Sequence, residues 1–190
     1  PGEDLTADMV RRFAEAAEAV HELDEYRHAA QLLFSAPSGQ ALATQRVHGD
    51  FHLGQVLHRS APAGSPWVII DFEGEPLKTL AERREFDSVW RDVAGLLRSL
   101  DYARSAHADP DGHEARQWCA AAREAFLDGY SGKHRAEPAL LRAYELDKAV
   151  YEVVYEVRNR PNWAHIPWRA VQDEARRVSL NPPAPNDKEQ

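Results

Sequence analysis

Two short segments carry side chains that could together perform phosphoryl transfer. They are residues 47–55 (VHGDFHLGQ) and residues 69–76 (IIDFEGEP). In the first, Asp50 can accept a proton from a substrate hydroxyl and Gln55 can bind a metal ion. In the second, Asp71 follows an apolar run and can hold the same ion against the phosphates of a nucleotide. The two segments, in this order and at this spacing, predict a phosphoryl-transfer site.

Asp50 is the predicted catalytic base. It lies between a glycine and an aromatic residue, so its carboxylate can face outward from a loop. A hydroxyl nucleophile loses its proton late in the transfer, and a carboxylate within hydrogen-bond reach is sufficient to receive it. The alternative is a turn aspartate that accepts backbone amides, as is common for an isolated Gly-Asp pair. The second segment favours the catalytic interpretation.

Gln55, Asp71 and Glu73 are the predicted metal ligands. An amide oxygen and carboxylates are hard ligands that suit Mg²⁺. Residues two apart in an extended segment point to the same side, so Asp71 and Glu73 could serve one or two Mg²⁺ ions. Alternatively, Gln55 bonds only to backbone, and Glu73 or Glu75 pairs with one of the arginines at positions 83, 84 and 91.

Four further residues are expected to support these loops. His48 and His52 are four residues apart, but Gly49 and Gly54 indicate a loop, whereas that spacing favours a zinc site only on a helix. We therefore expect hydrogen bonds from the histidines to brace the catalytic loop.

Arg91 and Asp92 open a predicted helix. Asp92 either interacts with the helix dipole or braces the catalytic loop, and the sequence does not separate these interpretations.

A helix predicted over residues 138–160 carries a candidate sugar-binding surface. Three tyrosines and a lysine form one stripe, and glutamates form the adjacent stripe. Aromatic rings beside charged groups suit a sugar, although tyrosines at a core boundary beside paired surface charges would give the same pattern. The candidate residues are Tyr144, Lys148, Tyr151, Glu152, Tyr155 and Arg160.

The remaining pattern predicts a mainly α fold with one small β-hairpin. Helices are expected over residues 5–33, 89–104, 114–130 and 167–178, with Asp4 or Thr6 capping the first. A strand is expected over 44–48 and a hairpin from 56–58 and 67–70. Residues 1–180 form one lobe that carries both loops, and residues 181–190, rich in proline, are expected to be disordered.

Composition narrows the class of protein. The chain has 190 residues, a net charge of −8 and one cysteine. The negative charge argues against a nucleic-acid partner, and we find no stretch apolar enough to span a membrane. One cysteine fits a reducing compartment, so we expect a cytoplasmic protein.

The motifs resemble the C-terminal lobe of the actinobacterial maltokinases, which have a protein kinase-like fold related to the aminoglycoside phosphotransferases. The matching positions are residues 45–50, 55–57, 70–76, 91–99, 101–103, 143–161 and Trp163. The resemblance implies ATP- and Mg²⁺-dependent phosphorylation of maltose at its anomeric hydroxyl, giving maltose 1-phosphate for α-glucan synthesis. It also implies an association, covalent or not, with trehalose synthase.

The resemblance leaves two alternatives open. One is a kinase of the same fold that acts on another sugar, such as glucosamine; the other is a non-catalytic helical module that binds a sugar or a protein.

The chain has no glycine-rich strand pair and no strand lysine before the catalytic loop. We therefore expect negligible kinase activity from these residues alone.

Overall fold

The computed structural model describes residues 2–37, 43–59, 66–75, 79–131 and 139–183. The chain divides into two compact units. The helical unit comprises Pro1–Ala43 and Ala136–Gln190, and the hairpin unit comprises Thr44–Arg135. Among the described residues, no helix is long and apolar enough to cross a membrane.

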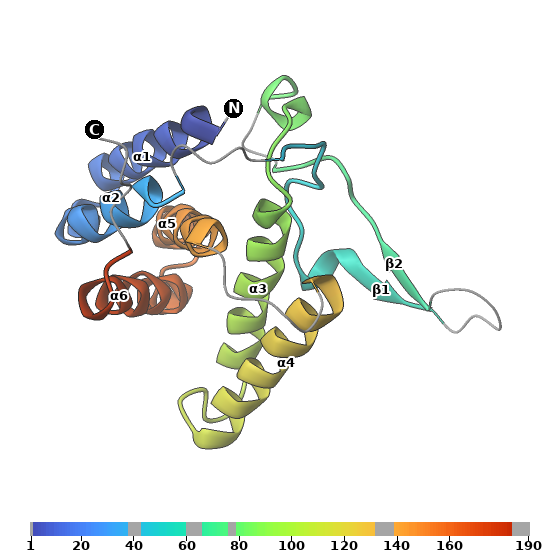
Figure 1. Cartoon of the computed structure of the whole chain (residues 1–190). Helices are drawn as coiled ribbons and strands as arrows, with labels where there is room; N and C mark the ends of the chain where they lie inside the picture. The colour runs from blue at the N-terminus through green and yellow to red at the C-terminus, as the bar shows by residue number, and fades with distance from the viewer. Residues whose placement is uncertain (1, 38–42, 60–65, 76–78, 132–138, 184–190) are drawn as a thin grey trace. The chain divides into compact units, whose positions relative to one another are not determined.

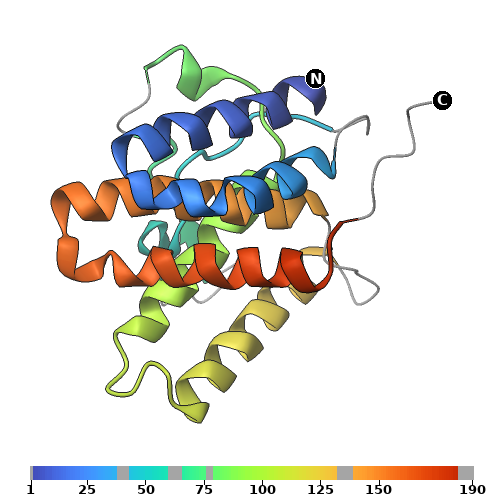
Figure 2. The same cartoon turned by 90° about the vertical axis from the view of Figure 1, so that its left-hand side faces the viewer.

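The helical unit is built from four α-helices that lie side by side (Figures 1 and 2). They are α1 (Gly2–Ala19), α2 (Arg27–Ser35), α5 (Ala139–Asn159) and α6 (His165–Leu180), with two short 3₁₀ helices, η1 (His21–Tyr26) and η4 (Pro161–Trp163). Apolar side chains from all four helices are buried and form its core, namely Met9, Phe13, Leu33, Phe34, Leu141, Val153 and Val171.

The single helix expected over residues 5–33 is wrong. The chain leaves the helical conformation at Val20, which is extended (φ −138°, ψ 92°), and resumes as η1 and α2. Val20 and Leu23 are buried at this bend, and the bend lets α1 and α2 pack against each other. Because α1 begins at Gly2, positions 4 and 6 lie within the helix and not at the residue that precedes it.

Prolines set the boundaries of the last two helices. α5 ends at Asn159, and Pro161 begins η4, because proline lacks the amide hydrogen that would continue the helix. α6 begins at His165, two residues before the predicted start, and Pro167 lies in its first turn, where a missing amide hydrogen costs nothing. The predicted start of α5 at residue 138 and the tail at 184–190 lie outside the described residues.

The hairpin unit contains the small sheet and a pair of packed helices. β1 (Val56–His58) and β2 (Trp67–Ile69) are antiparallel, with Val56 opposite Ile69 and His58 opposite Trp67 (Figure 1). They follow a short 3₁₀ helix, η2 (Leu53–Gln55). The other elements are η3 (Glu82–Arg84), α3 (Trp90–Ser105) and α4 (His113–Ser131), and α3 packs against α4.

The hairpin and the mainly α character are confirmed, but two details differ from expectation. The strand expected over 44–48 is wrong, since only an isolated bridge joins Gln45 to Asp87. An apolar strand such as the one before Asp71 is normally buried, yet Trp67 and Ile69 are 58% and 44% exposed. A two-stranded hairpin has too little sheet to bury both of its faces.

Candidate functional site

The two predicted loops lie against each other in the hairpin unit. His48 Nε2 is 2.8 Å from the carbonyl oxygen of Ile70. Gly49 and Gly74 both have positive φ (87° and 77°), and a Cβ on Gly49 would lie 3.3 Å from the Cα of Gly74. Two glycines therefore allow the backbones to approach closely, and the loops form one site.

Asp92 braces the loop that contains Asp50. Its Oδ2 accepts the backbone N–H of His48 at 2.7 Å, and its Oδ1 accepts that of Gly49 at 2.8 Å. Hydrogen bonds to a charged acceptor are stronger than those between neutral groups. Burial raises the pKa of Tyr130, and the nearby carboxylate of Asp92 raises it further.

His48 is the central side chain of the site. It is 7% exposed, and its ring lies 5.5 Å from that of Phe51 and 4.7 Å from that of Phe72. The backbone N–H of Asp50 donates to Nδ1 at 3.4 Å, so the ring proton lies on Nε2 and is donated to Ile70. One neutral histidine thus bonds to both loops.

One face of α3 carries residues that sequence reasoning missed. Ser99 Oγ accepts the backbone N–H of Leu53 at 3.0 Å. A Cβ on Gly95 would lie 2.6 Å from the carbonyl oxygen of Phe51, so only glycine allows this approach. Asp92, Gly95 and Ser99 recur at helical spacing and therefore lie on one face of α3. Small or polar residues on one face of a largely apolar helix were the signal in the sequence that could have indicated this contact.

Gln55 and Asp71 are in direct contact. Gln55 Nε2 donates to Asp71 Oδ2 at 2.9 Å. Asp71 is the one non-glycine among the described residues with positive φ (63°), a conformation in which an aspartate is tolerated. Two adjacent oxygen-bearing side chains fit a hard cation that takes its other ligands from phosphates and water. No cluster of three or more His, Cys, Asp or Glu that could hold a metal occurs among the described residues.

The expected geometry of Glu73 is wrong. Residues 72 and 73 form a turn after the left-handed Asp71, so positions 71 and 73 are not in an extended segment. The side chain of Glu73 is exposed, and its carbonyl oxygen accepts from Arg83 at 3.5 Å. Glu73 therefore remains a predicted metal ligand, but the expectation that it points to the same side as Asp71 no longer supports that prediction.

Arg91 ties the second loop to α3. It pairs with the buried Glu75 at 2.9 Å and with Asp87 at 2.8 Å. The alternative considered for Glu75, an ion pair with a following arginine, is therefore what the structure contains. This pair fixes the end of the loop that begins at Asp71.

His52 caps η2. Its Nδ1 accepts the backbone N–H of Gly54 at 3.0 Å, and its Nε2 lies 3.4 Å from Nε2 of Gln55. Both predicted loop-supporting histidines thus form hydrogen bonds within the loop region, and His52 contacts a candidate metal ligand directly.

The candidate sugar-binding residues lie on α5, in the helical unit. Lys148 Nζ is 4.9 Å from the ring centroid of Tyr151, which stacks with Tyr155 at 6.4 Å. Tyr144 is only 3% exposed, so its ring packs in the core. This agrees with the alternative interpretation, in which the tyrosines of this helix lie at the boundary of the core. Tyr155, by contrast, is 38% exposed and available to a ligand.

The two glutamates in the second half of α5 have little access to solvent. Glu152 and Glu156 are buried, and Arg160 forms two hydrogen bonds to Glu156. The guanidinium of Arg160 also lies 5.4 Å from the ring centroid of Tyr155 and 5.0 Å from that of Trp163. Charge and aromatic surface therefore meet at the end of this helix.

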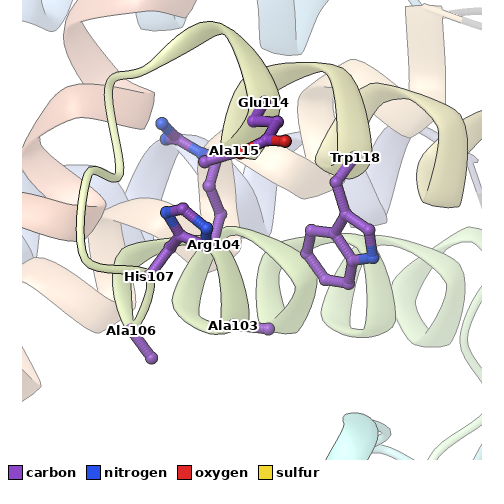
Figure 3. A pocket seen from close by; sticks show the side chains of 7 residues that line it. All are labelled: Ala103, Arg104, Ala106, His107, Glu114, Ala115 and Trp118. Atoms are coloured by element: carbon purple, nitrogen blue, oxygen red, sulfur yellow. The ribbon is translucent and has the colours of Figure 1, made fainter.

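Two pockets of the described residues contain none of these candidates. A pocket of about 420 Å³ lies between the end of α3 and the start of α4, with Trp118 as one wall (Figure 3). A second, of about 570 Å³, lies in the helical unit beside Tyr26 and Trp168. The first is lined by Ala103, Arg104, Ala106, His107, Glu114, Ala115 and Trp118.

Comparison with known proteins returned glucosamine kinases. The chain is 31% identical over 140 residues to a glucosamine kinase from Streptacidiphilus jiangxiensis, covering 67% of the chain and 31% of that protein. It is 33% identical over 142 residues to one from Mycolicibacterium smegmatis (strain ATCC 700084 / mc(2)155), covering 65% and 33%. The chain thus spans about a third of the length of these relatives. No family model matches the sequence.

Solved structures agree with the sequence relatives. Glucosamine kinase in complex with glucosamine, ADP and inorganic phosphate superposes with a TM-score of 0.77 at 26% identity, covering 94% of this chain and 49% of that one. A second crystal form of glucosamine kinase gives a TM-score of 0.75 at 26% identity, covering 90% and 44%. The fold is sugar kinase-like. The expected kinase-like architecture is confirmed at this level, whereas these relatives do not support maltokinase specifically.

Proposed function

We propose that this chain is the part of an ATP-dependent sugar kinase that carries the catalytic loop, and that the acceptor sugar is glucosamine. The observation that supports this most strongly is the joining of the Asp50 loop to the Gln55–Asp71 pair. The glucosamine kinase relatives favour glucosamine, the alternative named from the sequence, over maltose. These relatives give no support for an association with trehalose synthase.

In the proposed reaction, Asp50 accepts the proton of a sugar hydroxyl. The hydroxyl oxygen forms a bond to the γ-phosphorus of ATP while the bond from that phosphorus to the β-phosphate oxygen breaks, and ADP leaves. The backbone of the loop is fixed by Asp92 and His48. Such fixing contributes to catalysis because the carboxylate is held near the reacting oxygen before the reaction begins.

A divalent cation fits beside the contact between Gln55 of the first loop and Asp71 of the second. Gln55 and Asp71 would hold Mg²⁺, with Glu73 as a further candidate ligand, and the ion would neutralise charge on the nucleotide phosphates. Arg91 holds Glu75 and therefore fixes the loop that presents Asp71.

The acidic and aromatic character of α5 suits an amino sugar. Glucosamine carries an ammonium group, which favours carboxylates and aromatic faces, whereas maltose is uncharged. Tyr151 and Tyr155 supply aromatic faces, and Lys148 and Arg160 can bond to hydroxyls.

A panel of sugars tests the proposal with the full-length protein, by coupling ADP release to a spectroscopic assay. We expect the highest kcat/KM for glucosamine, lower values for glucose and maltose, and a loss of about 10²-fold or more in kcat in Asp50→Asn, which lacks the base. A preference for maltose would reject the acceptor, and undiminished turnover by Asp50→Asn would reject the mechanism. Glu124→Gln, a change on the exposed surface of α4, serves as the control.

A further inference from the structure

We propose that His52 is a positioning residue that turns the side-chain amide of Gln55 so that its oxygen faces the divalent cation. The inference rests on the proposed function, because it concerns the cation that such a kinase uses. It is argued from the contacts among His52, Gly54, Gln55 and Asp71.

The protonation of the His52 ring follows from its contact with Gly54. A backbone N–H can only donate, and this one lies 3.0 Å from Nδ1 of His52. Nδ1 must therefore offer a lone pair, and the single proton of the neutral ring lies on Nε2. The ring is closely confined, because a Cβ on Gly54 would lie 2.8 Å from its Cε1.

The Nε2 proton of His52 faces the amide of Gln55. In the structure the amide nitrogen donates to Asp71 at 2.9 Å and lies 3.4 Å from His52 Nε2. Both nitrogens carry hydrogen, so this contact joins two donors and forms no hydrogen bond. A half-turn of the amide exchanges its nitrogen and oxygen, and the oxygen can then accept from His52.

The two orientations of the amide suit two states of the site. Without a cation, the negative carboxylate of Asp71 attracts the amide NH₂ group. With a cation beside Asp71, the amide oxygen is the favourable neighbour, and only in that orientation does His52 gain an acceptor. Because its hydrogen bond forms in the cation-binding orientation alone, His52 shifts the equilibrium toward cation binding.

Two substitutions separate this role from the cap of η2. His52→Asn retains an acceptor near the position of Nδ1 for Gly54 but has no donor at the position of Nε2. His52→Gln places an amide N–H near the position of Nε2. His58→Asn is the matched control, since His58 lies on β1 and its ring packs on Trp67 at 4.8 Å.

The test is a Mg²⁺ titration of the 190-residue chain, followed by the NMR signals of the two loops, with the His52 tautomer read from its ring-nitrogen signals. We expect the proton on Nε2, about tenfold weaker Mg²⁺ binding in His52→Asn, and affinity near wild type in His52→Gln and His58→Asn. Unchanged affinity in His52→Asn, or a proton on Nδ1, would overturn the inference. If Asp71→Asn leaves the Mg²⁺ response intact, the proposed cation site itself is wrong, whatever His52 does.

Discussion

At the scale of single residues, side chains that bond to the backbone hold the site together more than contacts between the candidate catalytic groups do. The two oxygens of Asp92 each accept one amide of the catalytic loop, and the two nitrogens of His48 connect that loop to the next. Each bond satisfies a backbone group that would otherwise lose its solvent partner on burial. The conformation of the loop is therefore fixed by its supports.

Cys119 provides a prediction about pH. Burial and, to a smaller extent, the negative charge of Asp101 raise the pKa of its thiol from 9.0 to about 11. The unfolded chain therefore loses this proton at lower pH than the folded chain, and the contribution of the thiol to stability is complete below pH 9 and lost as the pH rises through 11.

We expect the free energy of unfolding, measured with urea, to fall more steeply between pH 9 and 11 in wild type than in Cys119→Ala. Below pH 8 the difference in free energy of unfolding between wild type and Cys119→Ala should be independent of pH, which serves as the internal control. Parallel curves up to pH 11 would show that the thiol titrates normally.

At the scale of elements, α3 organises the hairpin unit. Its Asp92, Gly95 and Ser99 contact successive residues of the segment from His48 to Leu53, and its other face packs against α4. One rigid helix therefore sets the path of a loop that has no regular structure of its own.

Gly95→Ala tests this arrangement. The new methyl group would lie 2.6 Å from the carbonyl oxygen of Phe51, so the loop or the helix must shift. We expect a loss of about 1–3 kcal/mol in the free energy of unfolding and altered NMR signals from Asp50 to Leu53. Gly129→Ala on α4 is the control, because no atom lies within 4 Å of its added Cβ, and it should be neutral or stabilising by up to about 1 kcal/mol. Equal effects of the two substitutions would contradict the close approach.

Elements with local signals were predictable from the sequence, whereas contacts between elements were not. The hairpin and the boundaries of α3, α4 and α5 follow from periodicity and proline positions to within a few residues. The break at Val20 was missed because it is stabilised by packing of α1 on α2, and the apolar periodicity continues through it. Two features depend on contacts with a loop that is distant in sequence, namely the turn at Asp71–Glu73 and the roles of Gly95 and Ser99. A local sequence pattern does not indicate such contacts.

At the scale of the whole molecule, the predicted chemistry is divided between the two units. The proposed catalytic and metal-binding loops belong to the hairpin unit, and the candidate sugar-binding helix α5 belongs to the helical unit. The proposed kinase therefore needs both units, although each has its own packed helices.

Hydrogen exchange should reveal unequal stability across the chain. Among the described strands, β1 and β2 pair only with each other and carry mostly exposed side chains, whereas α5 contains buried residues such as Leu141 and Val153. We expect the strand amides to exchange by local opening and the α5 amides only by larger unfolding, and mass spectrometry of peptic fragments measures this. Slower exchange in the hairpin than in α5 would contradict the expectation.

The left-handed backbone of Asp71 also constrains how this position can change during evolution. Glycine, asparagine and aspartate tolerate a φ of 63°, while most other residues raise the energy of the folded state. A homologue that has lost its chemistry but kept its fold should therefore carry asparagine or glycine here. Under the proposed function, such a protein would keep its fold but lack the carboxylate that is proposed to bind the cation, so one substitution at this position could separate the fold from the activity.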